Sequence, residues 1–186
     1  SGDVTHIYTS AADSNSYARR DVYICPTGGY YTMESSIIKK YSSPDVLDIT
    51  FGTEGQLTIP YNTFDGAIDA DGNLFFTCCS GESEGGNLLI KVNPEGVIDN
   101  SYGDAGKLDI TAPTNKIEFD SIGRMYIAGW YFEGRYHYVQ RINADGTLDT
   151  TFGTDGTLDV IDTESEIVNI KLDSDDNLYV ITFGNH

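Results

Sequence analysis

The chain has 186 residues, 39% of them hydrophobic, and its 13 Tyr and 20 Gly favour a soluble globular protein rich in β-strands and tight turns. Its formal net charge of −18 argues against nucleic acid or an anionic membrane as a partner, because phosphate groups are bound by basic surfaces that release counterions. No apolar run approaches the roughly 20 residues needed to span a bilayer, so we expect no membrane insertion.

The first unit of the chain covers approximately residues 1–60 and begins with two strand-like segments, Val4–Ser10 (VTHIYTS) and Arg19–Cys25 (RRDVYIC). It ends in the segment Lys40–Ile59, KYSSPDVLDITFGTEGQLTI, where turn residues separate short apolar runs. Cys25 lies at the end of a strand-like segment, where a buried cysteine acts as a small hydrophobe, and we expect it to be a free thiol.

The second unit, approximately residues 61–111, contains the segment DADGNLFF around Leu74 and ends in KVNPEGVIDNSYGDAGKLDI. Its two cysteines, Cys78 and Cys79, are adjacent, and a disulfide between neighbours would close a strained ring, so we expect none. Three cysteines cannot form a closed disulfide framework, and no C-x-x-C spacing indicates zinc or redox chemistry. The cysteines therefore do not indicate whether the protein is found in an oxidising or a reducing compartment.

The third unit, approximately residues 112–161, shows the local pattern most clearly. A short alternating segment (NKIEFD) is followed by a β-branched and aromatic run (RMYIAGW), a second run (YHYVQRIN) and a closing segment (TLDVI). Turn residues separate them, and Gly146 in the Asp145-Gly146 turn can adopt a positive φ at little cost. About four short strands joined by hairpin turns are the content of one propeller blade.

The units repeat with a nearly constant period. Three aromatic residues, Phe51, Tyr102 and Phe152, are each followed by a glycine, at Gly52, Gly103 and Gly153, and they are separated by 51 and 50 residues. Periods of this size indicate solenoids, propellers or arrays. We predict an all-β fold, a β-propeller or partial propeller built from four-stranded repeats of about 50 residues, with the three aromatic rings, and Leu148 beside Phe152, buried between neighbouring blades.

The last unit, approximately residues 162–186, is incomplete, because EIVNIKLDSDDNLYVITF supplies only two strands. Its second strand, Asn177–Phe183, contains no proline and no charged residue that would protect an exposed edge. An open edge leads to one of two outcomes. A segment of another copy or another protein completes the sheet, or an N-terminal strand such as Val4–Tyr8 returns to cover it.

The closing segment of the third unit, RINADGTLDTTFGTDG, resembles the delta-60 repeat, a β-propeller-type repeat with NHL-like blades typified by R-x-N-x-D-G-x-L-D-x-x-F-G-x-x-G. The third copy matches nearly throughout, at Arg141, Asn143, Asp145, Gly146, Leu148, Asp149, Phe152, Gly153 and Gly156. The second copy keeps Asn93, Gly96, Asp99, Gly103 and Gly106. The first copy keeps Leu47, Asp48, Phe51, Gly52 and Gly55, and it has Pro44-Asp45 in place of the Asp-Gly turn. The resemblance, which covers most of residues 37–186, implies a fold and surface-exposed proteins without a shared catalytic activity.

Two patterns are compatible with metal chemistry. The acidic turns Asp69–Asn73 (DADGN) and Asp173–Asn177 (DSDDN) are similar to calcium loops, but they lack the bidentate Glu of such a loop, and a hairpin turn uses the same residues. We therefore expect no cofactor, with calcium as the less favoured possibility. The alternative function, a divalent-metal-dependent enzyme of lactonase type, would gather polar side chains in a central channel. Its candidates Asp69, Glu118 and Lys171 mix charge signs, and no G-x-S-x-G motif indicates a serine nucleophile.

One hairpin, GWYFEGRYHY, is richer in aromatic residues than its counterparts in the other units. A stacking platform for a sugar ring or a partner's side chain could be formed by Trp130, Tyr131, Arg135, Tyr136 and Tyr138. Ordinary cross-strand aromatic pairing is the alternative explanation. We expect a non-catalytic binding or structural module that contacts a protein, a glycan or other copies of itself at a cell or virion surface.

Overall fold

The computed structural model describes residues 20–79, 87–110, 114–130, 137–160 and 165–184. Every secondary-structure element in these residues is a β-strand, which confirms the predicted all-β class. The strands form four antiparallel sheets. The predicted strand Val4–Ser10 lies outside the described residues.

The first sheet contains five strands, with β5 paired to β3: β1 (Arg20–Ile24), β2 (Tyr30–Glu34), β3 (Ile37–Ser43), β4 (Val46–Leu47) and β5 (Gln56–Thr58). The second sheet has the order β6 (Thr63–Ile68), β7 (Leu74–Cys79), β8 (Asn87–Val92) and β9 (Lys107–Ile110). The third sheet has the order β10 (Thr114–Phe119), β11 (Met125–Trp130), β12 (His137–Ile142) and β13 (Thr157–Val160). The fourth sheet consists of β14 (Ser165–Leu172) and β15 (Leu178–Gly184).

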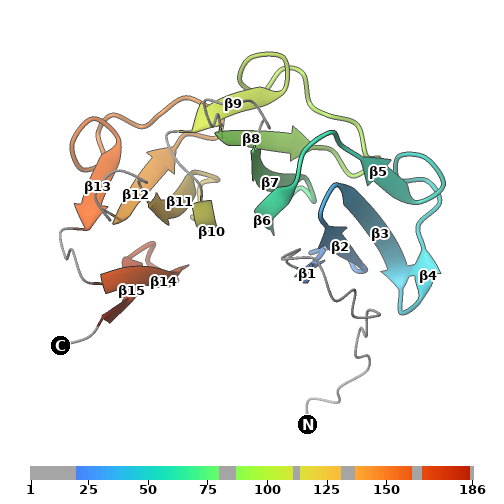
Figure 1. Ribbon diagram of the computed structural model, residues 1–186, viewed down its shortest axis with the longest axis horizontal. Coiled ribbons are helices and arrows are strands. Elements are labelled where there is room, and N and C mark those ends of the chain that lie inside the picture. Colours follow the sequence, from blue (N-terminus) through green and yellow to red (C-terminus); the bar gives the residue numbers. More distant parts are fainter. Residues whose placement is uncertain (1–19, 80–86, 111–113, 131–136, 161–164, 185–186) are drawn as a thin grey trace, which may run out of the picture.

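The four sheets follow one another around an arc, and the first and fourth sheets stand at its two ends (Figure 1). The first strand of each sheet lies on the inside of the arc, where β1 contacts β6, β6 contacts β10 and β10 contacts β14. Outer strands such as β9 and β13 lie at the rim. Radially arranged, twisted four-stranded sheets are the architecture of a β-propeller.

The hydrophobic core lies between neighbouring sheets, because each sheet is apolar on the face that meets the next one. Between the first and second sheets, Tyr31 and Met33 pack with Phe76 and Ile90. The interface of the second and third sheets contains Phe75, Leu89, Ile117, Ile127 and Ile142. The fourth sheet is held on the third by Tyr126, Ala128, Val139, Ile167 and Ile170.

Turn geometry agrees with the sequence analysis where it depends on glycine. Gly146 has a φ of 88°, as predicted for the Asp145-Gly146 reversal, and its amide donates to the carbonyl of Asn143 at 2.9 Å. Gly103 has a φ of 63°, and a Cβ placed there would lie 2.3 Å from the carbonyl oxygen of Lys107. A side chain at this position would therefore displace the first residue of β9.

The repeated aromatic residues differ in burial. Phe51 and Tyr102 are buried, with 0% and 3% of their surface exposed, as predicted. Phe152 is only half-buried, and Leu148 is 41% exposed, so the predicted burial of Leu148 is wrong. All three cysteines are free thiols, as expected, and burial raises the pKa of Cys78 to about 12.

Candidate functional site

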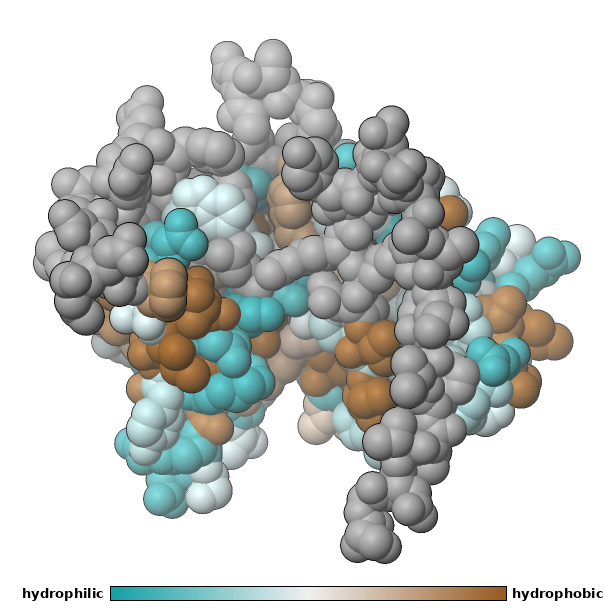
Figure 2. Space-filling model, turned by 60° about the horizontal axis from the view of Figure 1, so that its bottom comes forward, coloured by the Kyte–Doolittle hydropathy of each residue, from teal (hydrophilic) through white to brown (hydrophobic). Residues whose placement is uncertain are grey.

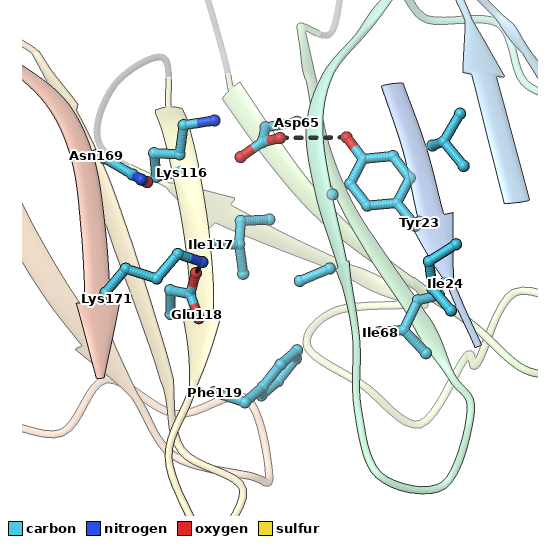
Figure 3. Close-up of a pocket in the computed structure, with 13 residues that line it drawn as sticks. Tyr23, Ile24, Asp65, Ile68, Lys116, Ile117, Glu118, Phe119, Asn169 and Lys171 are labelled. Carbon is cyan, nitrogen blue, oxygen red and sulfur yellow. Dashed lines mark hydrogen bonds and ion pairs between the residues drawn. The ribbon is translucent and has the colours of Figure 1, made fainter. Parts of the chain in front are cut away.

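A cavity of about 550 Å³ lies where the first strands of the four sheets approach one another (Figure 3). Its wall is built by residues of β1, β6, β10 and β14. The polar lining residues are Tyr23, Asp65, Lys116, Glu118, Asn169 and Lys171.

Two pairs of polar side chains contact each other in this cavity. The hydroxyl of Tyr23 donates to Oδ1 of Asp65 at 3.1 Å, and the ammonium group of Lys171 pairs with the carboxylate of Glu118. Figure 3 shows Lys116 extending from β10 toward Asp65. The cavity lining therefore contains both cationic and anionic side chains, and at least one carboxylate, that of Glu118, is neutralised by a lysine.

Asp69, Glu118 and Lys171, the candidates for a central-channel site in the alternative function, do not all occupy equivalent positions. Glu118 pairs in register with Tyr126 and Lys171 with Tyr179, and the residue of β6 in the same position is Ala67. Asp69 lies two residues further along, in the turn after β6. Its equivalents are Asp120 and Asp173, whose Oδ1 atoms likewise accept a hydrogen bond from the backbone amide four residues later.

The two acidic turns use their first carboxylate to close the turn. Oδ1 of Asp69 accepts hydrogen bonds from the backbone amides of Asp71 and Asn73, at 3.0 and 2.8 Å, while Oδ2 accepts from the side chain of Asn73. Asp173 accepts the equivalent bonds from Asp175 and Asn177. The geometry is that of a side-chain-closed hairpin turn. The expectation that no cofactor binds, with calcium as the less favoured possibility, stays a prediction.

In the part of the chain that the structure describes, no three His, Cys, Asp or Glu side chains are placed so that they could hold a metal ion. Nor does that part contain a helix of the length and apolar character needed to cross a membrane. The described histidine, His137, is buried in β12 and joins two sheets, because its Nδ1 accepts a hydrogen bond from the amide of Ile167 at 3.2 Å. Burial lowers the pKa of His137 below its ordinary value.

The predicted aromatic platform is described only at its two ends. Trp130 is half-buried at the end of β11, and Tyr138 in β12 is fully buried, so the ring of Tyr138 is not available to a partner in solution. The other three predicted residues, Tyr131, Arg135 and Tyr136, lie outside the described residues. A binding surface formed by the rest of this hairpin stays a prediction.

A second set of residues recurs in the first three sheets, and we call it the cation clamp. It consists of an aromatic residue on the second strand, a Lys or Arg opposite it on the third strand, an Asp eight residues later, and a second aromatic residue three positions after the Asp. Its members are Tyr31, Lys40, Asp48 and Phe51 in the first sheet, Phe75, Lys91, Asp99 and Tyr102 in the second, and Tyr126, Arg141, Asp149 and Phe152 in the third.

The geometry of the cation clamp is nearly the same in each sheet. The two aromatic rings meet edge to face, with centroids 5.3, 5.4 and 5.5 Å apart in the three sheets. The cation lies over one or both rings, and Arg141 is 4.8 Å from the centroid of Phe152. The cation also pairs with the Asp, at 3.1 Å for Lys40, 3.1 Å for Lys91 and 2.7 Å for Arg141. The Lys or Arg of each clamp therefore makes a cation–π contact and an ionic contact at the same time.

Each clamp carboxylate also closes its own loop. Oδ1 of Asp149 accepts hydrogen bonds from the amide and the hydroxyl of Thr151, at 3.0 and 2.6 Å. Thr50 and Ser101 make the same bonds in the other two sheets. The hydroxyl donor, with a contribution from the cation, lowers the pKa of Asp48, Asp99 and Asp149 below the ordinary value. The repeated motif is therefore occupied by structural contacts. The equal spacing of Lys40–Asp48, Lys91–Asp99 and Arg141–Asp149 was the signal in the sequence that could have revealed it.

The fourth sheet contains only part of a cation clamp. Tyr179 occupies the position of Tyr31, Phe75 and Tyr126, but 55% of its surface is exposed. Ile181 and Phe183, on the same face of β15, are 49% and 68% exposed. Figure 2 shows apolar surface on the left of the molecule, the side on which Figure 1 places β14 and β15. Leu178 and Val180, which alternate with them, pack on the third sheet instead.

Comparison with known proteins agrees with this architecture. A family described as a domain of unknown function (DUF5122) β-propeller matches residues 123–152, from the end of the β10–β11 turn to Phe152 of the third cation clamp. No curated protein matches the chain.

Among solved structures, the chain is similar to a protein of unknown function from Bacteroides caccae, with a TM-score of 0.56 and 15% sequence identity. The alignment covers 89% of this chain and 54% of the solved one, so the chain spans about half the length of the structure it matches. At this identity the similarity shows the fold alone. The four sheets, the family match and the structural similarity together identify the chain as an all-β protein of the β-propeller-repeat type.

Proposed function

We propose that the protein is a non-catalytic, protein-binding module built from propeller repeats of the delta-60 type, and that it works by assembly through its fourth sheet. The observation that carries this proposal is the uncovered apolar face of β15. In each of the other sheets the equivalent face is covered by the next sheet, which buries Tyr31, Phe75 and Tyr126. Tyr179, Ile181 and Phe183 present the same kind of surface to solvent.

An apolar β-sheet face of this kind favours association with another polypeptide. The strand that carries it has no charged residue, whereas the chain as a whole has a net charge of −18. General repulsion between copies therefore keeps non-specific contacts weak, and the uncharged strand is where association costs least. A location at a cell or virion surface is consistent with such an acidic assembly module and is part of the proposal.

Sedimentation velocity over a range of protein concentrations, at low and at high salt, tests the assembly surface. We expect weak association between copies that strengthens when salt screens the repulsion. Phe183→Lys should abolish it, and Val97→Lys should leave it unchanged, because Val97 is 58% exposed in a turn of the second sheet, away from the proposed surface. A chain that is monomeric at every concentration and salt and also binds no other polypeptide through β15, or one whose association responds equally to both substitutions, would contradict the proposal.

A further inference from the structure

We propose that the free edge of β15 binds a polypeptide segment with the chemistry of the third and fourth strands of this repeat. The segment carries a Lys or Arg that lies opposite Tyr179 and a glycine turn that packs against Phe152. The inference rests on the proposed function, because it names the partner that the fourth sheet takes up.

The register of the sheets gives the position of the cation. Tyr31, Phe75 and Tyr126 lie directly opposite Lys40, Lys91 and Arg141 on the neighbouring strand. Tyr179 is their equivalent, because it pairs with Lys171 on β14 as Tyr126 pairs with Glu118 on β10. Within the described residues β15 is bonded to β14 only, so its other edge is the place where a third strand would bind.

A second contact involves Phe152, at the far end of the third sheet. A Cβ at Gly96 would lie 3.1 Å from the ring of Phe51, and one at Gly146 would lie 3.0 Å from the ring of Tyr102. Each aromatic residue is thus buried by the glycine turn of the following sheet. Phe152 is half-buried because the described fourth sheet has no strand to bring such a turn.

These two contacts place a strong constraint on the partner. Its strand must have a cation opposite Tyr179 and, five residues later, a glycine that fits against Phe152, the spacing of Lys91 to Gly96 and of Arg141 to Gly146. Its own Asp and second aromatic residue would then complete the fourth cation clamp. Main-chain hydrogen bonds along β15 supply affinity, and these side chains supply specificity.

Two other occupants satisfy these requirements less well. In a second copy, the strands that carry Lys40, Lys91 and Arg141 are already paired on both edges within their own sheets. The N-terminal residues 1–19 contain a single Lys or Arg, Arg19. The next residue, Arg20, is paired with Glu34 in the first sheet, so Arg19 is tied to that sheet by the chain. A second copy would have to give up existing strand pairs to place a cation opposite Tyr179, and Arg19 is the single Lys or Arg that residues 1–19 could offer.

Binding of a synthetic peptide to the full chain tests the inference. The probe is a labelled peptide with the sequence of residues 137–160, HYVQRINADGTLDTTFGTDGTLDV, and the matched controls are the same peptide with R141M or G146V. We expect saturable binding of the unchanged peptide by fluorescence anisotropy. Binding should be roughly tenfold weaker for the R141M peptide, which loses the cation–π and ionic contacts. The G146V peptide should also bind more weakly, because its side chain would meet Phe152.

Substitution of the protein's own side of the contact, at Tyr179, provides a complementary test. Tyr179→Ala should weaken binding of the unchanged peptide by roughly tenfold and remove the difference between it and the R141M peptide. Ile122→Ala should change neither, because Ile122 is 69% exposed in the turn between β10 and β11 and lies outside the proposed contact.

The outcomes separate the inference from the proposed function. Equal binding of the unchanged and R141M peptides would overturn the clamp chemistry while supporting the fourth sheet as a binding surface. Absence of peptide binding together with salt-dependent association of the chain would overturn the inference alone. Absence of both would overturn the inference and the proposed function together.

Discussion

The third and fourth sheets begin with equivalent pairs of strands, but among the described residues only the third sheet continues into two more strands. In the third sheet, Tyr126 is 3% exposed and its hydroxyl accepts a hydrogen bond from Arg141 on the neighbouring strand. In the fourth, Tyr179 is 55% exposed and its hydroxyl donates instead to Asp173 of its own turn. The same aromatic position is thus part of the core in one sheet and part of the surface in the other. The difference shows that the burial of this position depends on what covers the face of the strand, because the fourth sheet packs over Tyr126 and no described sheet packs over Tyr179.

The largest expected effect is a loss of folding stability when the second aromatic residue of a clamp is removed, and it should differ between the first and the third sheets. Phe51→Ala should lower the free energy of unfolding by about 3–5 kcal/mol, the usual cost of emptying a buried aromatic site. Phe152→Ala should cost clearly less, because its ring is only half-buried and its removal leaves a smaller enclosed cavity. Urea denaturation of both variants measures the difference. Equal losses would mean that Phe152 is covered in solution.

The glycine after the aromatic residue provides the next comparison. Gly103→Ala should be strongly destabilising, because its left-handed conformation costs an L-residue about 1–2 kcal/mol and the new Cβ would meet the carbonyl of Lys107. Gly123→Ala is the matched control, since it shares the positive φ but its Cβ would find its nearest neighbour at 3.9 Å. Thermal denaturation should rank Gly103→Ala as the less stable variant. The reverse order would contradict the packing of this turn.

Lowering the pH should reduce the stabilisation that the carboxylates of the three complete clamps provide. The pKa of Asp48, Asp99 and Asp149 is lowered in the folded state, so their contribution to stability is full above the ordinary value near 3.8 and is lost as the pH falls through the lower folded pKa. Thr151→Val removes the main cause of the shift at Asp149 and should weaken the pH dependence of stability below about pH 4. Urea midpoints between pH 2 and 6 measure it. If the urea midpoint of Thr151→Val falls with pH as that of the unchanged protein does, Thr151 does not lower the pKa of Asp149.

A smaller and more local effect involves the attachment of the fourth sheet to the third. The pKa of His137 is lowered by burial, so the neutral ring is favoured in the fold and its contribution is present above the ordinary value of 6.5. As the pH falls through the lower folded pKa, protonation of Nδ1 removes the acceptor for the amide of Ile167. Exchange of that amide, corrected for its intrinsic rate, should accelerate at acid pH in the native protein. In His137→Phe this pH dependence should be absent.

Much of the fold was predictable because period and turn chemistry are local. The Asp145-Gly146 reversal, the alternation within NKIEFD and the β-branched and aromatic run RMYIAGW reflect local conformational preferences, and they indicated the strands and their order along the chain. The cation clamp was missed because it depends on which residues lie opposite one another, and a one-residue change of register places different side chains together. The equivalence of Asp69 with Asp120 and Asp173, by contrast, is already indicated by the turn sequences DADGN, DSIGR and DSDDN.

The burial of Phe152 and Leu148 could not be predicted for another physical reason. Both match the repeat motif, yet burial is decided by what the neighbouring sheet contributes. Phe152 meets no glycine turn among the described residues, and Leu148 lies on the exposed side of its loop, near Gly156. A motif can therefore specify the same local backbone in every copy while the environment of its side chains differs.

Hydrogen exchange along β15, compared with β11, tests most directly whether the fourth sheet has a free edge. Both edges of β11 are paired, with β10 and β12, so its amides from Met125 to Trp130 should exchange slowly throughout. In β15, alternate amides between Leu178 and Phe183 that point away from β14 should exchange far faster than their counterparts in β11, and they should become protected when the peptide of residues 137–160 is added. Uniform slow exchange across both strands in the isolated chain would show that the edge is already covered and would contradict the account.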